Sequence, residues 1–231
     1  MNIEPIAYFH SPIEGKFGLP RQSGLAESLH GEIVLIEKYR QEEALRGLEG
    51  FDYIWLIWGF HLNREDSSHD KLTVRPPRLG GNERIGVFAS RSPYRPNPIG
   101  LSSVKIERII PQKGIIEVLG ADIANGTPIY DIKPYIEYAD SHSGIRSGFT
   151  DTREWKSLNI YFECKIPERL SHEDLSALEC ILSQNPKPQY QHDPNRIYHI
   201  VFNGIDFHFT VDGDSAIVVG TSEPSPATCK R

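Results

Sequence analysis

The most restrictive feature of this sequence is the run FDYIWLIWGF, residues 51–60, which is apolar or aromatic at almost every position. Aromatic and β-branched side chains favour strands, and the run has the length of a single strand. Because it is apolar on both faces, we expect it to be a central strand of a sheet. It would deliver His61 and Leu62 at its C-terminal end.

Shorter segments elsewhere carry strand patterns. Residues 102–110 alternate, with Val104, Ile106 and Arg108 on one side and Lys105, Glu107 and Ile109 on the other, and residues 114–119 are the expected hairpin partner. Many short strands with few helices predict a closed or nearly closed β-barrel. The other elements predicted in this part of the chain are strands at 3–9 and 31–37, a glycine-rich loop at 14–25, a short helix at 41–48, a tight turn at 125–126 and a strand ending at 131–135.

The stretch GVFASRSPYRPNPIGL, residues 86–101, has the densest chemistry. We expect residues 87–89 to begin it as an apolar strand. Arg91, Arg95 and Asn97 then alternate with three prolines, each of which fixes its own φ and restricts the residue before it. A stiff arginine loop suits two-point recognition of a carboxylate, a phosphate or a base edge. An ordinary surface loop with solvated arginines is the alternative.

Four further polar loops resemble it in chemistry, and all follow or precede strands. They contain Pro20-Arg21-Gln22, His61, the Arg75–Arg78 run and residues 122–135. Together the five loops predict a site for a polar, anionic ligand. His61 alone is weak evidence, because a histidine at a strand end is more often a structural residue.

Charge distribution points the same way. The chain has a formal net charge of −6, yet residues 71–95 hold six basic side chains against one acid, a local excess of five. The three cysteines are far apart and form no CxxC pair, which argues against disulfides and against a cysteine zinc site and fits a reducing cytoplasm. The N-terminal residues have no signal-peptide pattern, and no apolar run approaches the length of a membrane helix.

The C-terminal third has a different character. Residues 139–153 are expected to form a linker, followed by a strand at 158–164 and a helix that Ser171 caps and that ends near residue 183. Asn203-Gly204 between two apolar runs is a strong hairpin signal. We therefore predict a mainly β protein with two domains, a barrel at residues 1–140 and a small α+β domain at 151–222.

Several common sites are excluded. The sequence has no GxGxxG after a strand, no GxxxxGK[ST] and no HExxH, and its nine histidines are scattered. Neither a Rossmann cofactor site nor a P-loop is predicted, and no metal site is predicted.

Four motifs in their order and spacing, LPRQSGL, VRPPRLGGN, GVFASRSPYRPNPIGLS and NGTPIYDIKPY, resemble the TrmO family, also called TsaA-like or YaeB. The resemblance covers residues 1–138 through these motifs and continues more loosely to about 220. It implies an S-adenosylmethionine-dependent methyltransferase that modifies N6 of threonylcarbamoyladenosine at position 37 of tRNA. It also implies a β-barrel that holds the methyl donor, a cytoplasmic homodimer and tRNA as partner.

Carried onto this chain, the resemblance gives the expected donor-binding residues, and the reaction that it implies gives catalytic and RNA-binding residues as hypotheses. Asp131 would accept hydrogen bonds at the adenine amine and Tyr135 would stack, although Asp131 capping a turn and Tyr135 filling the core are equally open. The expected donor-binding residues are Pro20, Arg21, Gln22, His61, Leu62, Arg91, Leu101, Asp122, Ile123, Ala124 and Asn125. The expected RNA-binding residues are Arg75, Arg78, Arg84, Arg95 and Lys133.

Two other functions use the same residues. A non-catalytic RNA- or nucleotide-binding barrel would need the arginines but no donor pocket. A methyltransferase acting on another small substrate would suit the net acidity of the chain.

Overall fold

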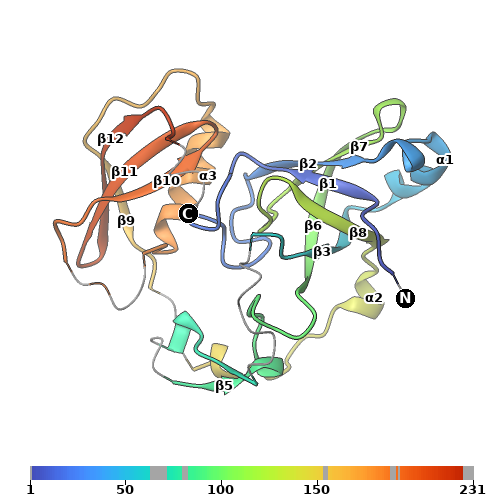
Figure 1. Cartoon of the computed structure of the whole chain (residues 1–231), viewed down its shortest axis with the longest axis horizontal. Coiled ribbons are helices and arrows are strands. Elements are labelled where there is room, and N and C mark those ends of the chain that lie inside the picture. The colour runs from blue at the N-terminus through green and yellow to red at the C-terminus, as the bar shows by residue number, and fades with distance from the viewer. Residues whose placement is uncertain are drawn as a thin grey trace.

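Antiparallel strands, with the predicted central strand among them, close into a barrel, as the computed structural model shows (Figure 1). The structure describes residues 2–62, 72–79, 83–152, 156–187, 191 and 193–225. The strand order is β1-β2-β7-β6-β3-β8, and the ring closes between β8 and β1. The bounds are β1 Ala7–His10, β2 His30–Leu35, β3 Tyr53–Gly59, β6 Ile99–Ile110, β7 Ile115–Leu119 and β8 Thr127–Pro134.

Strand β3 lies between β6 and β8, which confirms its central position. Its alternate residues Ile54, Leu56 and Trp58 are at most 7% exposed and join the barrel core. Trp55 and Ile57 point to the outer face and are half-buried. The apolar character on both faces of this strand therefore reflects one face in the core and one partly covered face outside.

The predicted alternation of β6 holds only for its first part. A β-bulge lies between Ile106 and Arg108 where β6 pairs with β7, and it adds one residue on the β6 side. Beyond the bulge the phase is reversed, so Ile109 packs against the barrel core while Arg108 is exposed. The placement of Arg108 on the same face as Val104 and Ile106 was wrong for this reason.

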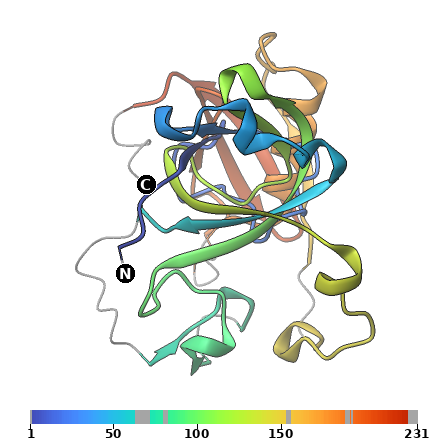
Figure 2. The same ribbon diagram turned by 90° about the vertical axis from the view of Figure 1, so that its right-hand side faces the viewer.

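The segment between β3 and β6 leaves the barrel. It contains the two-stranded sheet of β4 (Thr73–Val74) and β5 (Ile85–Gly86) and extends to one side of the barrel, as do residues 137–152 (Figure 2). The apolar strand predicted at 87–89 is wrong: Val87–Ala89 is a 3-10 helix. The N–H and the hydroxyl of Ser90 both donate to the carbonyl of Val87, at 3.2 and 2.8 Å, and close this turn.

A second, four-stranded sheet of order β10-β11-β12-β9 and one helix build the C-terminal part. Ser171 caps α3 as predicted: its hydroxyl accepts from the Asp174 N–H, and the Asp174 carboxylate accepts from the Ser171 N–H, a capping box. The hairpin at Asn203-Gly204 is confirmed. The bounds are β9 Asn159–Phe162, α3 His172–Ser183, β10 Tyr198–Phe202, β11 Ile205–Asp212 and β12 Ser215–Ser222.

The molecule has two hydrophobic clusters, one inside the barrel and one between the second sheet and α3. Ile13, Ala26 and Leu29 of the first long loop belong to the second cluster, so this loop packs against the C-terminal part. The division into two domains at 1–140 and 151–222 stays a prediction.

The remaining elements are one turn or a little more in length. No helix among the described residues has the length and apolar character needed to cross a membrane. The short elements are η1 Glu37–Tyr39, α1 Glu42–Leu45, η2 Leu48–Gly50, η3 Pro77–Leu79, η5 Pro111–Lys113, α2 Glu137–Asp140 and η6 Gly148–Thr150.

Candidate functional site

Most of the expected donor-binding residues gather at one end of the barrel, where β3 and β7 end and β6 and β8 begin. Strand β6 pairs with β7 only from Lys105 onward, so its first residues have no strand partner on that edge. The loop after Pro20 lies along this edge. The Ser23 hydroxyl donates to the Ser103 carbonyl, and the Gly24 N–H donates to the Gly120 carbonyl at 2.8 Å.

Asp122 is the acidic group of this edge. Its carboxylate accepts a hydrogen bond from the Ser102 hydroxyl at 2.6 Å, and that hydroxyl accepts from Nε1 of Trp58 at 3.0 Å. Burial raises the pKa of Asp122, whereas the Ser102 hydroxyl, the backbone N–H of Ser23 and the charge of Arg91 favour its ionised form. The carboxylate is thus fixed in direction by the barrel core.

Two arginines of this end have different environments. Arg91 is exposed and its guanidinium donates to the Gln22 side-chain oxygen. Arg21 instead faces the C-terminal end of α3, where its Nη2 donates to the Asn185 carbonyl at 2.8 Å and its Nε to the Gln184 carbonyl at 3.1 Å. Burial lowers the pKa of Arg21 to about 10. The structure therefore brings Gln22, Arg91 and Asp122 together and ties Arg21 to the C-terminal part.

His61 lies on the other side of the same barrel end. Its Nδ1 is 3.2 Å from the Thr127 hydroxyl, which donates to the Ala124 carbonyl at 2.8 Å. Leu62 follows it in a turn, while Ile123 and Ala124 are buried and Asn125 is bonded to Glu14 and to the Ser11 N–H. Burial lowers the pKa of His61, so the imidazole is neutral at pH 7.

The lowered pKa of His61 predicts a pH effect on stability. An unfolded histidine titrates near pH 6.5 and the folded one at lower pH, so the unfolded chain binds more protons between these values. We expect the contribution of His61 to the free energy of unfolding to be complete above pH 6.5 and to decrease as the pH falls through the pKa of the folded state. Urea midpoints of wild type and His61→Gln, measured from pH 8 down to pH 5, should diverge at acidic pH; parallel curves would contradict this.

Leu101 and Asp131 share the outer face of the barrel. Register pairs Leu101 with Ile57 and Ile57 with Asp131, so they are two strand spacings apart, about 10 Å. Leu101 is 59% exposed. The Asp131 carboxylate is half-exposed and pairs with Nζ of Lys133 at 2.9 Å.

Tyr135 is four residues beyond Asp131, about 13 Å along the extended strand. Its ring packs against Trp55 and Tyr53, with ring centroids 5.5 and 6.3 Å away. The structure therefore does not place Tyr135 beside Asp131, although both belong to the outer face. Asp131 lies within strand β8 and not in a turn, and among the described residues its Oδ1 accepts one backbone hydrogen bond, from the N–H of Ile132.

The basic residues expected to bind RNA lie mainly in the segment between β3 and β6. Arg75 and Arg84 are exposed beside β4 and β5, and Arg95 is half-buried with Nη1 donating to the Ser90 carbonyl at 3.2 Å. The side chain of Arg78, like residues 63–71, lies outside the part of the chain that the structure describes.

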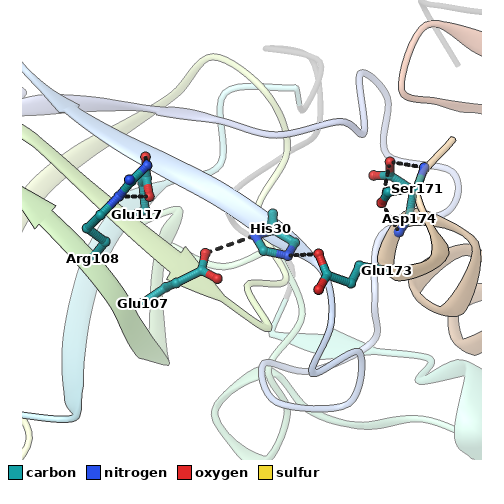
Figure 3. Close-up of polar contacts among 7 residues, drawn as sticks. All are labelled: His30, Glu107, Arg108, Glu117, Ser171, Glu173 and Asp174. Atoms are coloured by element: carbon teal, nitrogen blue, oxygen red, sulfur yellow. Dashed lines mark hydrogen bonds and ion pairs between the residues drawn. The ribbon is translucent and has the colours of Figure 1, made fainter. Parts of the chain in front are cut away.

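A hollow of about 860 Å³ lies elsewhere, between the barrel and the C-terminal part. His30 bridges the two parts there: its Nδ1 is 2.9 Å from Glu107 and its Nε2 is 3.4 Å from Glu173 of α3 (Figure 3). Glu32, Glu117 and Asp174 also line it, with Arg108 bonded to Glu117. This acidic wall does not suit a polyanion, so we do not place RNA there.

Sequence reasoning missed the residues that hold the site residues in position by hydrogen bonds. Ser102 and Trp58 orient Asp122, and Gln184 receives Arg21 through contacts 163 residues apart in sequence. In the alternating pattern of β6, Ser102 is a polar residue in phase with the inward-facing Val104, and that break in the apolar pattern is a sequence signal that could have indicated it.

The closed antiparallel barrel is not a Rossmann fold, and Gln22, Arg91 and Asp122 lie together at one of its ends. A family model described as the tRNA-methyltransferase O N-terminal domain matches residues 8–141. The chain belongs to this family.

Relatives of the chain carry names that are consistent with this family. The Escherichia coli (strain K12) protein named tRNA (adenine(37)-N6)-methyltransferase is 39% identical, covering 81% of this chain and 83% of its own. A Pseudomonas aeruginosa protein named putative S-adenosylmethionine-dependent methyltransferase RcsF is 38% identical over 90% of this chain and 91% of its own. The crystal structure of TrmO from Pseudomonas aeruginosa superposes with a TM-score of 0.75 and 30% identity, covering 96% of this chain and 98% of that one.

Proposed function

We propose that this chain transfers a methyl group from S-adenosylmethionine to N6 of threonylcarbamoyladenosine at position 37 of tRNA. Membership of the family and the names of its relatives support an S-adenosylmethionine-dependent tRNA methyltransferase. The observation that carries the proposal is the joint placement of Gln22, Arg91 and Asp122 at the unpaired edge of β6. The threonylcarbamoyl group rests on the family resemblance.

The residues of this edge fit the methyl donor in chemical type. S-adenosylmethionine, when bound, supplies an electrophilic methyl group on a sulfonium and carries a carboxylate, an ammonium and an adenine. The Arg91 guanidinium would pair with the carboxylate and Asp122 with the ammonium. Leu101, 59% exposed beside them in β6, offers an apolar surface to the adenine. The backbone groups of residues 122–125 would read its polar edge.

Asp131 is the group that we propose for the acceptor. The adenine N6 is a poor nucleophile because its lone pair is delocalised into the ring. A carboxylate that accepts a hydrogen bond from the N6 hydrogen orients the amine and stabilises the charge that develops on it. Tyr135, with Trp55 and Tyr53, would stack on a neighbouring base of the anticodon loop.

We also propose a homodimer in the cytoplasm. Large apolar side chains are exposed on β6 and the segment before it: Phe88 is 77%, Tyr94 is 45% and Ile99 is 38% exposed. A second copy of this chain is the occupant that we propose for this surface, and light scattering after gel filtration would measure it. A monomer at micromolar concentration would contradict it.

One experiment tests reaction, donor and acceptor together. The purified chain is incubated with S-adenosylmethionine and with tRNA that carries or lacks threonylcarbamoyladenosine, and nucleosides are analysed by mass spectrometry. We expect one added methyl on the modified adenosine alone. Methylation of free nucleosides or other small molecules in place of tRNA would favour a small-molecule methyltransferase, and absence of donor binding would favour a non-catalytic RNA-binding barrel.

The basic segment predicts a salt dependence of tRNA binding. Arg75 and Arg84 are exposed on the β4–β5 segment, and each phosphate contact contributes about 0.7–0.9 to the slope of log affinity against log salt. Arg75→Ala and Arg84→Ala should each weaken tRNA binding and reduce the slope by about that amount. The matched control is Arg46→Ala, a side chain 77% exposed after α1. Equal slopes in all three variants would exclude this surface.

A further inference from the structure

Three residues of the C-terminal hairpin form a compact cluster far from the edge described above. His199 of β10 and Asp206 and His208 of β11 each offer one atom, and these atoms all lie within 4.8 Å of one another. Nδ1 of His199 is 3.2 Å and Nε2 of His208 is 3.8 Å from Oδ2 of Asp206. The two imidazole rings have centroids 4.5 Å apart.

Strand pairing explains how these residues meet. The register places His199 directly opposite His208, while Asp206 precedes His208 by two residues and so shares its face. The intervening residues Ile200 and Phe207 point to the opposite face, into the cluster with α3. The three polar residues therefore stand on the face of the sheet opposite to α3.

Asp206 is unusual for an outer-face residue because it is only 3% exposed. Among the described residues its hydrogen-bond and ion-pair partners are the two imidazoles. Burying a carboxylate is costly unless a positive charge or several hydrogen-bond donors compensate it, and a neutral imidazole offers one weak donor. A divalent cation would supply the missing charge, and it would use both imidazoles in their neutral form.

We propose that His199, Asp206 and His208 bind a divalent first-row transition cation of the Zn²⁺ type. Two imidazole nitrogens and one carboxylate oxygen form a ligand set that suits such ions and not Mg²⁺ or Ca²⁺. Ligands at about 2.0–2.1 Å around a tetrahedral ion stand about 3.3 Å from one another. The two separations from Oδ2, 3.2 and 3.8 Å, lie close to this value, and all three ligand atoms lie within 4.8 Å of one another, so binding requires the rings to rotate toward the ion.

The fourth position faces β12. The Ser222 hydroxyl is 3.0 Å from Nε2 of His208 and would hold a bound water there. Gly220 lies opposite His208 in the register, and a Cβ at this position would be 3.8 Å from the imidazole Nδ1, an ordinary van der Waals contact. The ion would link β10 and β11 and fix the hairpin on which α3 packs; it takes no part in the proposed methyl transfer.

Linear spacing does not reveal this site. The ligands stand at positions 199, 206 and 208, with a hairpin turn between the first and the others, and no helical metal motif has this pattern. The prediction of no metal site rested on such motifs.

The test uses the full-length chain, dialysed against a chelator and titrated with Co²⁺, whose visible absorption reports nitrogen coordination; Zn²⁺ is then added as a competitor. We expect one Co²⁺ per chain and displacement by Zn²⁺. We also expect Zn²⁺ to raise the thermal unfolding midpoint. His142→Gln, an exposed histidine in the 139–147 segment, is the matched control and should behave like wild type.

His208→Gln should reduce the Co²⁺ affinity by at least about 100-fold, because even the outer partners of metal ligands contribute about 10–100-fold. It should also abolish the Zn²⁺ effect on the midpoint. Asp206→Asn should act in the same way, and His208→Gln keeps the test valid if the buried substitution prevents folding. Absence of Co²⁺ binding in wild type, or equal affinity in His208→Gln, would overturn the proposal and leave a hydrogen-bonded His–Asp–His cluster.

Discussion

Replacing Asp131 by alanine is expected to lower the rate of methyl transfer by about 100-fold or more while S-adenosylmethionine binding stays close to that of wild type. The reason is the position of Asp131 on β8, one strand beyond Ile57 and two beyond Leu101. It lies beside the proposed donor site, and no hydrogen bond or ion pair among the described residues joins it to Arg91, Gln22 or Asp122. Single-turnover rates with modified tRNA and calorimetric titration with the donor measure the two quantities.

Two further variants separate chemistry from folding and from charge. Asp131→Asn keeps the side-chain shape and an acceptor oxygen but removes the negative charge, so its rate should lie between those of wild type and Asp131→Ala. Lys133→Ala removes the ion pair at 2.9 Å and leaves the carboxylate in place. That variant should retain the single-turnover rate at saturating tRNA. If donor binding and transfer are lost together in Asp131→Ala, the proposed role of this carboxylate is wrong.

Much of the fold was predictable because the information for these elements is local. FDYIWLIWGF has a composition that only a central strand accommodates, and the Asn203-Gly204 turn and the Ser171 cap are set by neighbouring residues. Local patterns do not contain the bulge at Ile106–Arg108, which depends on how β6 follows β7 around the barrel. The strand predicted at residues 87–89 was wrong for a similar reason, because three apolar residues carry no period that distinguishes a strand from a turn.

For the candidate site, the sequence predicted the residues proposed to contact the donor but not the residues that orient them. The motifs indicated Gln22, Arg91 and Asp122, and the structure brings these together. The expected partnership of Asp131 with Tyr135 did not account for the rise of an extended strand, which separates them. The hydrogen bonds from Trp58 to Ser102 and from Ser102 to Asp122 join residues 44 and 20 positions apart, and only the closed barrel creates them.

That chain of hydrogen bonds gives the second large effect, at Gly100. This glycine is buried opposite Trp58 in the β3–β6 register, and a Cβ at its position would lie 2.6 Å from Cδ2 of the indole. The ring has little freedom to move, because Phe60 packs edge-on against it at 4.4 Å and Nε1 donates to Ser102. Gly100→Ala should therefore destabilise the fold by about 1–3 kcal/mol, as overpacked cores do.

The same substitution should weaken donor binding, because a displaced indole moves the Ser102 hydroxyl that orients Asp122. Urea midpoints and calorimetric titration with S-adenosylmethionine measure the two effects. Gly86→Ala is the matched control: its φ is −58° and nothing lies within 4 Å of the added methyl, so stability should change little.

A double variant tests whether the indole transmits the effect. Trp58→Leu creates space beside position 100, so the added methyl should cost less in that background than in wild type. A coupling energy of about 0.5–3 kcal/mol between the two substitutions is expected for residues in contact. Additive changes in the midpoint, or normal donor affinity in a clearly destabilised Gly100→Ala, would show that the Trp58–Ser102–Asp122 chain does not position the carboxylate. The site would then depend on the loop that carries Asp122 and not on the barrel core beneath it.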